Sequence, residues 1–298
     1  WLKHQDQDFG FPDIYKRSRN DMIERNLHWL RVLLKYALPP VDVLEVGCGH
    51  GSFIALMQQA GYKATGVELS PWVVDYARKT FNIDVRMGPV ESLGFSHGSI
   101  DVIVLMDVLE HLSDPVATIA YCVNLLKDNG FLLVQTPKFK EHLSHSDLID
   151  HGDRFLEMLI PDEHIYLFSE RSAKALFKLL GAEYICFEPA IFSHYDMFFV
   201  VSRMPFVTHP TTEIETNLLA NPNGRFALAL LDLRERELGF YQRWTELDAD
   251  RVKNLTQLAE LNEQIVILQA SCTAKDMQLA QLTSQLQEGE ARLVELDR

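Results

Sequence analysis

The chain has 298 residues, which is room for one α/β domain and a further segment, and 47% of its residues are hydrophobic. Its formal net charge of −14 provides no basic stripe for a phosphate backbone, so nucleic acid is excluded as an expected substrate. No apolar stretch approaches the roughly 18 residues that span a bilayer, the start lacks a signal-peptide pattern, and the four cysteines lie far apart, so we expect a cytoplasmic protein with neither a transmembrane segment nor disulfides.

An amphipathic helix is predicted over residues 13–37, inside an N-terminal segment that we assign to residues 1–40. Its apolar side chains recur at helical spacing and are Ile23, Leu27, Leu30 and Leu34. The helix is expected to end before Pro39 and Pro40, because a proline cannot continue it.

An apolar strand at residues 43–46 runs into three alternate glycines and then into a helical pattern. The glycines are Gly47, Gly49 and Gly51. Because glycine adopts positive φ and has no Cβ, this backbone can turn sharply and press against a ligand at the start of the helix. A dinucleotide loop would need a glycine where Ser52 stands, which argues against an NAD-dependent oxidoreductase. Glu45 would repel phosphate and suits a cationic ligand.

Glu68 ends a second apolar run at residues 64–67, 21 residues after Gly47. A carboxylate at the end of this strand can accept hydrogen bonds from both hydroxyls of a ribose. Glu68 and the loop therefore indicate an adenosyl ligand without phosphates.

Apolar runs and helical patterns alternate from residue 43 to residue 180. The runs lie at 43–46, 64–67, 83–87, 100–106 and 131–136, and the helical patterns near 51–60, 71–81, 115–127 and 169–180. This alternation predicts an α/β fold with a doubly wound parallel sheet. Two later runs, Tyr184–Glu188 and Met197–Ser202, are close enough to pair as a hairpin. The predicted domain covers residues 41–210.

After Pro210 the sequence changes character, and a polar linker is predicted at 211–229 before a helical region at 230–298. A heptad repeat with Leu230 as position a continues for about nine heptads without a proline. Fifteen of its twenty a and d positions are apolar, which predicts a coiled coil roughly 100 Å long at ~1.5 Å per residue.

A coiled coil cannot bury its own seam, so a homo-oligomer is expected. Its polar core residues Arg251, Asn254 and Lys275 are candidates for fixing register and strand number. The alternative is a helix that folds back on the preceding domain or on itself as a hairpin.

Five ordered motifs across roughly residues 40–205 resemble the class I S-adenosylmethionine-dependent methyltransferases, in the subgroup of ubiquinone-biosynthesis and bacterial sugar or glycan O-methyltransferases. The motifs are Glu45–Gly51, which matches E/D-x-G-x-G-x-G, Gly66–Ser70 with Gly88–Glu91, Ile100–Leu112, Gly130–Pro137 and Asp162–Ser169. The resemblance implies a Rossmann-like seven-stranded sheet with an antiparallel last strand and an N-terminal helix that lids the cofactor.

The resemblance also implies which residues bind S-adenosylmethionine. They are Glu45, Gly47, Cys48, Gly49, Gly51, Glu68, Leu69, Val90, Glu91 and Asp107. Glu45 is expected to accept loop N–H groups near the amino-acid end of the cofactor, and Glu91 either approaches the adenine or only caps a turn. Cys48 is expected to be a small residue that fits the loop, without a redox role.

Two histidines stand where the resemblance places the acceptor, His111 after the fourth strand and His164 in Asp162-Glu163-His164. A sugar hydroxyl has a pKa far above 7, so a general base is expected to help its methylation, and histidine is the natural candidate. The alternatives are a helix cap for His111 and a loop histidine bonded to backbone for His164.

No metal is predicted, although two groups of residues offer one. Asp107–His111 matches, with Asp for the first Glu, an E-x-x-E-H set through which some ubiquinone-pathway relatives bind a divalent cation. His142, His145 and His151 form a second group whose spacing fits no standard ligand motif, and a solvated substrate loop explains it. This insert and the His194 loop are expected to set acceptor specificity.

The predicted function is O-methylation of a sugar or glycan hydroxyl by a cytoplasmic oligomer. A glycosyltransferase or another assembly is a candidate partner, through which the protein would reach the inner membrane. Methylation of a quinone or another small molecule is the alternative within this class. A non-catalytic coiled-coil scaffold is the alternative outside it, and the intact Gly47, Gly49, Gly51 and Glu68 argue against that reading.

Overall fold

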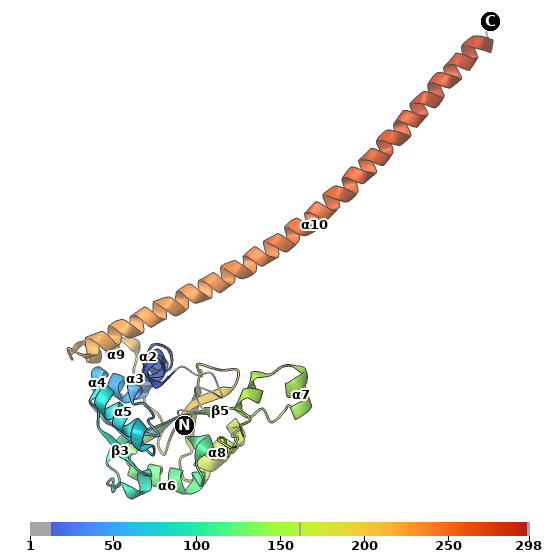
Figure 1. Ribbon diagram of the computed structural model, residues 1–298. Helices are drawn as coiled ribbons and strands as arrows, with labels where there is room; N and C mark the ends of the chain where they lie inside the picture. The colour runs from blue at the N-terminus through green and yellow to red at the C-terminus, as the bar shows by residue number, and fades with distance from the viewer. Residues whose placement is uncertain (1–12, 161, 297–298) are drawn as a thin grey trace. The chain divides into compact units, whose positions relative to one another are not determined.

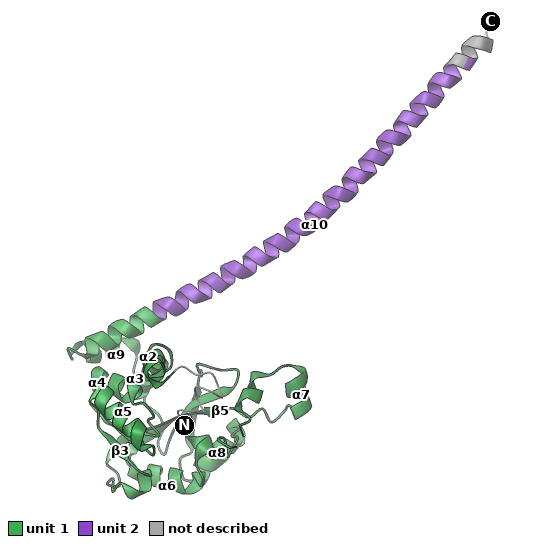
Figure 2. Cartoon of the chain, in the orientation of Figure 1, with its two compact units in different colours: residues 1–234 green, residues 235–298 purple. Residues whose placement is uncertain are grey.

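The computed structural model describes residues 13–160 and 162–296 and divides the chain into two units, residues 1–234 and 235–298 (Figure 2). The first unit is built on a seven-stranded sheet in the order β3-β2-β1-β4-β5-β7-β6 (Figure 1). The strands are β1 Asp42–Val46, β2 Lys63–Glu68, β3 Val85–Met87, β4 Ile100–Met106, β5 Leu126–Pro137, β6 Tyr184–Glu188 and β7 Asp196–Ser202. β7 runs antiparallel to both of its neighbours, and the other pairs are parallel, which confirms the predicted fold class.

Helices cover both faces of the sheet because apolar side chains point alternately to either side of each strand. In β4, Val102 and Val104 contribute to one core, and Ile103 and Leu105 to the other. The helices between β1 and β6 are α4 Ser52–Ala60, α5 Pro71–Phe81, η2 Val90–Ser92, η3 Leu109–His111, α6 Pro115–Leu125, α7 His145–Asp150, η4 Arg154–Met158 and α8 Glu170–Leu179. Side chains of α4 and α5 pack in the first core, and those of α6 and α8 in the second.

The strand order reverses between β1 and β4, which lie side by side in the centre of the sheet. Ligands of open α/β sheets bind beyond the carboxyl ends of the strands at such a switch point. The residues that follow β1 and β4, Gly47 and Asp107, therefore mark the expected site.

The predicted N-terminal helix is divided into three pieces. They are α2 Ile14–Asp21, the π-helical turn η1 Met22–Asn26 and α3 Leu27–Tyr36. The widened turn changes which side chains face the core: Leu27, Leu30 and Leu34 are buried as predicted, whereas Ile23 is 48% exposed. π-helical turns often occur at functional sites, and this one lies beside the glycine loop.

The segment predicted as a polar linker, 211–229, is largely helical. It contains α9 Thr211–Leu219 and the first turns of α10 Gly224–Leu296. Leu218, Ala227 and the following Leu231 are buried in the same core as α3. The prediction of a polar linker was wrong, because a few apolar residues spaced among polar ones pack this segment against the domain.

The second unit is the continuation of α10, and the described part of this helix runs without a break. The alternative of a helical hairpin is therefore wrong for these residues. Its apolar side chains are exposed in the single chain, including Leu258, Leu261 and Ile265.

Among the described residues, none of the helices combines the length and the apolar character that a membrane span requires.

Replacing Gly66 with alanine is expected to lower the free energy of unfolding by about 1–3 kcal/mol, because it would overpack the core beneath the glycine loop. A Cβ at Gly66 would lie 2.3 Å from Ile54 Cδ1 and 2.6 Å from Cys48 Sγ. Denaturant unfolding measures the change. The matched control is Gly239→Ala in α10, where no atom lies within 4 Å of the added Cβ, and a similar loss in both variants would contradict the prediction.

Candidate functional site

The glycine loop adopts the backbone that its sequence predicts. Gly47, Gly49 and Gly51 have φ values of 70°, 51° and 79°. A Cβ on Gly47 would lie 2.6 Å from Val108 Cγ2, which packs the loop against the segment after β4, whereas a Cβ on Gly49 would meet no atom within 4 Å. Gly49 therefore presents bare backbone to open space just before α4. The unpaired N–H groups at the N-terminus of a helix favour polar ligands there.

Glu45 lies beneath this loop and differs from the expectation. Its side chain is 3% exposed, and its Oε2 has no hydrogen-bond partner among the described residues, so it does not hold the loop N–H groups as predicted. Burial, together with the nearby charge of Glu68, raises the pKa of Glu45 well above its usual range. A buried carboxyl that lacks a partner is costly on its own and would be stabilised by a cationic group.

The Glu68 carboxylate faces the loop and also binds one of the loop's backbone N–H groups. Its Oε2 accepts the Gly49 N–H at 3.1 Å, and its Oε1 accepts the N–H groups of Leu69 and Ser70, each at 2.9 Å. A carboxylate offers about four acceptor sites, so one site on Oε2 stays open for a hydroxyl. Glu68 therefore also has a structural role, because its hydrogen bonds connect the end of β2 to the loop and to the start of α5.

Four other predicted cofactor residues lie in different surroundings. Leu69 is 67% exposed, while Val90 and Cys48 are buried in the two cores, which leaves only their backbone atoms for a ligand. The Glu91 Oε1 accepts the Thr118 hydroxyl at 2.6 Å, so this carboxylate holds η2 to α6.

Asp107 follows β4 in a strained conformation, with φ of 56°. Its two carboxylate oxygens are held from different sides. Arg25 Nη1 donates to Oδ2 at 2.9 Å, and Gln135 Nε2 donates to Oδ1 at 2.9 Å. Trp29 Nε1 in turn donates to Gln135 Oε1 at 2.9 Å. The N-terminal helices therefore fix the orientation of Asp107 through two routes.

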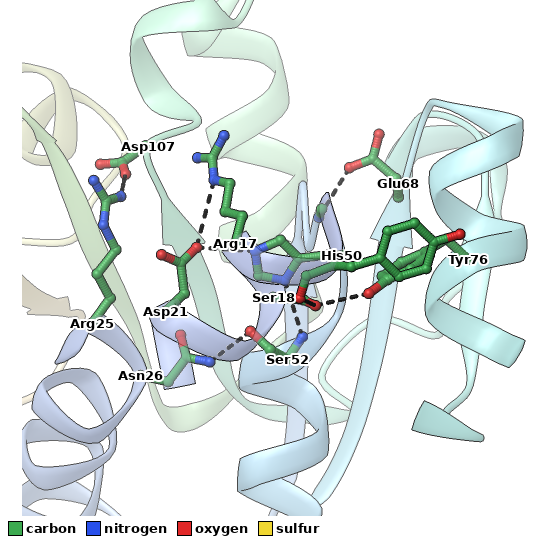
Figure 3. A network of polar contacts seen from close by, with 12 residues as sticks. Arg17, Ser18, Asp21, Arg25, Asn26, His50, Ser52, Glu68, Tyr76 and Asp107 are labelled. Atoms are coloured by element: carbon green, nitrogen blue, oxygen red, sulfur yellow. Dashed lines mark hydrogen bonds and ion pairs between the residues drawn. The ribbon is translucent and has the colours of Figure 1, made fainter. Parts of the chain in front are cut away.

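Further polar contacts join the N-terminal helices to the glycine loop and to α5 (Figure 3). Asp21 Oδ2 lies 3.0 Å from His50 Nε2, and Asn26 Nδ2 donates to Ser52 Oγ at 2.7 Å. Burial raises the pKa of Asp21, but the hydrogen bond and charge of His50, together with Arg17 and Arg25, outweigh it and hold that pKa below its usual value. These contacts hold the N-terminal helices against the loop, and their role as a lid over a cofactor stays a prediction.

The two predicted catalytic histidines lie together, with ring centroids 4.9 Å apart. His111 Nδ1 lies 2.6 Å from the Glu163 carbonyl, and His164 Nδ1 lies 2.6 Å from the Met158 carbonyl. Because a carbonyl only accepts, both Nδ1 atoms carry the proton, and both Nε2 atoms are left as acceptors when the rings are neutral. Burial lowers the pKa of His164, which favours its neutral form at pH 7.

Glu110 lies beside these histidines and is 1% exposed. Its Oε2 accepts the Thr136 hydroxyl at 2.9 Å, its Oε1 has no partner among the described residues, and Oε1 lies 3.9 Å from His111 Nε2. Burial, followed by the charge of Asp107, raises the pKa of Glu110 well above its usual range.

Glu110, His111 and His164 offer ligand atoms that all lie within 4.8 Å of one another and could hold a metal ion. This set differs from the one that the sequence offered, because Asp107 is engaged by Arg25 and Gln135 and His164 comes in from another segment.

The second histidine group does not form a comparable cluster. His142, His145 and His151 are exposed on the insert between β5 and α8, and His151 Nδ1 lies 2.6 Å from the Asp147 carbonyl of its own helix.

Asp196 was missed by the sequence reading. It begins β7 opposite Pro137, and because β7 is antiparallel its first residue lies at the carboxyl edge of the parallel strands. Burial, followed by the charge of Asp107, raises the pKa of Asp196 to about 8, although Arg25 opposes this shift. The only signal in the sequence is an acid directly before the apolar run Met197–Val201.

Asp196→Asn is expected to raise the free energy of unfolding by about 2 kcal/mol or more at pH 8 and to change it little at pH 4. With a pKa of 3.8 when unfolded and about 8 when folded, Asp196 binds an extra proton in the native state between these values, so its contribution to stability is lost as pH rises through that window. Denaturant unfolding from pH 4 to pH 8 measures the difference. Asp84→Asn, at an exposed position, is the control, and equal pH slopes for Asp196→Asn and the parent chain would contradict the prediction.

A profile of the protein family described as "Methyltransferase domain" matches residues 18–186, more than half of the chain. A ubiquinone biosynthesis O-methyltransferase from Xanthomonas campestris pv. campestris (strain B100) is 38% identical over 111 residues, which cover 35% of this chain and 46% of that protein. One from Xanthomonas oryzae pv. oryzae (strain PXO99A) is 36% identical over 125 residues, which cover 38% and 52%. The chain thus spans about half the length of these curated relatives.

Among solved structures, the fold is similar to a chain of the complex between the Haloferax volcanii Trm112 methyltransferase activator and a methyltransferase. The TM-score is 0.50 at 17% sequence identity, and the match covers 64% of this chain and 95% of that one. A likeness at this identity supports the fold.

Proposed function

Because the chain belongs to the methyltransferase-domain family, we propose that it transfers the methyl group of S-adenosylmethionine to a hydroxyl oxygen of a sugar or glycan, as an oligomer joined through α10. The observation that carries the cofactor part of this proposal is the glycine loop. The three glycines before α4 have positive φ, Gly49 leaves bare backbone facing open space, and Glu68 beside them keeps an open acceptor site.

The residues of the loop fit the proposed cofactor. The buried Glu45 oxygen without a partner suits a positively charged ligand, and S-adenosylmethionine carries positive charge on its sulfonium and ammonium groups. One ribose hydroxyl would meet the open acceptor site on Glu68 Oε2, and the adenine would lie near Leu69 and the backbone of Val90. When bound, the cofactor supplies an electrophilic methyl carbon.

The chain's own groups would position the acceptor and take its proton. Methyl transfer needs the two reacting atoms in line and in contact, so holding the partners together supplies much of the rate. Within the described residues, the Nε2 atoms of His111 and His164 make no hydrogen bond, and a base within hydrogen-bond reach of the hydroxyl contributes roughly 10²–10⁴-fold. The helices that cover the loop would exclude water.

Polar groups around Asp107 support a sugar as acceptor. Asp107, Arg25 and Asp196 gather at the carboxyl edge of the sheet, and Arg25 also lies 5.0 Å from the ring centroid of Phe192. Carboxyl groups, a guanidinium fork and an aromatic face match the many hydroxyls and the apolar face of a sugar.

A quinone-type phenol is the second candidate acceptor. The relatives from Xanthomonas bear the name of ubiquinone biosynthesis O-methyltransferases, and an apolar run beside His164 is exposed. Its residues Ile165, Tyr166 and Leu167 are 55%, 41% and 36% exposed. Such a run suits the apolar tail of a quinone precursor.

Calorimetric titration of the chain with S-adenosylmethionine tests the cofactor part, and a turnover assay with a panel of sugar and phenol acceptors tests the acceptor part. Saturable binding followed by methylation of a sugar hydroxyl is the expected result. Methylation of phenols alone would replace the sugar with the second candidate. Binding without turnover on any acceptor would favour a scaffold, and no binding would overturn the proposal.

A further inference from the structure

The second unit carries an exposed apolar seam along one side of α10. The seam consists of the large apolar residues at positions a and d, and each is at least 50% exposed: Phe240, Trp244, Leu247, Leu258, Leu261, Ile265, Leu268, Leu279, Leu282 and Leu286. The exposed apolar area of such a long stripe is greater than the few hundred Å² that a monomer usually exposes in one patch. It is long enough to supply the roughly 800 Å² per partner of a standard stable interface.

Two basic residues interrupt the seam, and each has an acid beside it at a flanking position. Arg251 occupies position a and follows Asp250 at position g, whereas Lys275 occupies position d and precedes Asp276 at position e. Knobs-into-holes packing between parallel helices in register places an a side chain beside the g residue of the facing helix, and a d side chain beside its e residue.

In this arrangement Arg251 would meet Asp250 of the next copy, and Lys275 would meet Asp276 of the next copy. Each cation in the seam would then be paired with an acid of the facing helix. Arg251 also forms an ion pair with Asp248 of its own chain at 2.8 Å. An antiparallel arrangement brings residues from a different part of the helix to these places, so the pairing of each cation with the acid next to the same position on the partner is specific to the parallel register.

The residues that flank the seam agree with the same arrangement. Parallel helices in register bring each g residue near the e residue five positions later on the partner. Arg243 at g and Asp248 at e then form an opposite pair, and the other such pairs between residues 250 and 290 bring no like charges together.

We propose that α10 associates in parallel and in register with further copies of this same chain. This inference rests on the oligomeric part of the proposed function and adds its geometry and its partner. Because α10 continues directly from the first unit, parallel association joins every methyltransferase unit to the same end of the bundle.

Cys272 provides a direct readout of orientation and register. It occupies position a and is exposed in the single chain, whereas Cys48 and Cys122 are buried and Cys186 is half-buried. In a parallel bundle in register, Cys272 of one copy faces Cys272 of the next, within the Cα separation of roughly 4.4–6.8 Å that a disulfide bridges. In an antiparallel bundle whose centre lies away from Cys272, the two Cys272 thiols are far apart.

The first test is oxidation of the full chain with diamide, which accepts the two electrons and two protons that the pair of thiols releases on forming the S–S bond. Light scattering is expected to show an oligomer, and non-reducing electrophoresis a covalent dimer that Cys272→Ser abolishes. The double variant Cys272→Ser/Thr273→Cys, with its thiol on the outer face, is the matched control and is expected to remain uncrosslinked.

The second test exchanges charges in the seam. Asp276→Lys would place two lysines side by side in a parallel bundle and is expected to weaken association by about tenfold or more. Lys275→Glu/Asp276→Lys keeps the net charge and restores opposite signs, so it is expected to recover the association constant of the parent chain.

A monomer would overturn both this inference and the oligomeric part of the proposed function. An oligomer without the Cys272 crosslink, or with no recovery in the charge-exchanged double variant, would overturn the parallel register alone. Titration with S-adenosylmethionine on the same preparations separates these outcomes from a failure of the methyltransferase assignment, because it does not depend on association.

Discussion

Replacing His164 with alanine is expected to lower the turnover number with a hydroxyl acceptor by roughly 10²–10⁴-fold while leaving the affinity for S-adenosylmethionine within about twofold. The ring is held through Nδ1 by the Met158 carbonyl, so its Nε2 is the atom that can accept a proton. Burial lowers its pKa from 6.5, which keeps the base neutral at pH 7 and moves the acid limb of the pH–rate profile below that of a free histidine. Steady-state kinetics on an acceptor found in the panel measures both effects.

His111→Ala and the double variant decide how the two histidines share this role. If one is the base and the other positions it, the double variant should be about as slow as the worse single variant, since residues that act as a unit are not additive. The set Glu110, His111 and His164 offers a second explanation, in which the histidines hold a cation. A chelator that lowers the turnover number of the parent chain would favour this explanation over a base, and unchanged turnover in both single variants would contradict the prediction.

Glu110→Gln separates a role in positioning from a role in proton transfer. Glutamine keeps an oxygen for the Thr136 hydroxyl but cannot carry a negative charge. If the buried carboxyl only shapes the floor of the site, the pH–rate profile should keep its acid limb. A shift of that limb would show that Glu110 acts through the neighbouring histidines, because Oε1 lies 3.9 Å from His111 Nε2.

The sheet was predictable because its signals are local and strong. Apolar runs separated by helical patterns fix an α/β fold, and the glycines at 47, 49 and 51 fix the place where the backbone must turn. The segment 211–229 was not predictable in the same way. Its tie to the domain depends on Leu218 and Ala227, which become buried only when α3 provides the other side of the contact.

The site was predictable as a set of positions and less so as a set of contacts. Spacing placed Glu68 at the end of β2, but only the folded loop shows that the Gly49, Leu69 and Ser70 N–H groups use three of its acceptor sites. Asp196 is more than 80 residues from Asp107 in sequence, and the antiparallel direction of β7 brings it to the same edge. No local pattern encodes this approach, because it depends on the order of the strands.

Glu68→Ala is expected to weaken binding of S-adenosylmethionine by about 10–100-fold, since hydrogen bonds to charged groups contribute roughly 1.5–3 kcal/mol. The variant removes the acceptor for the ribose and also frees the Gly49 N–H. Calorimetric titration measures the affinity, and Glu183→Ala, at an exposed position on the same unit, is the control that should bind as tightly as the parent chain.

Glu68→Gln distinguishes the two roles of this side chain. Its amide oxygen can still accept the Leu69 and Ser70 N–H groups, but its amide nitrogen would face the Gly49 N–H, so the loop loses one tie while α5 keeps its own. If the role of Glu68 is mainly to close the loop, both variants should lower the melting temperature and weaken binding in parallel. If it also receives the ribose, Glu68→Ala should bind worse than its loss of stability explains, because a hydroxyl can still pair with the amide but not with a methyl group. Affinity unchanged in Glu68→Ala would remove this carboxylate from the cofactor site and leave it as a tie between β2 and the loop.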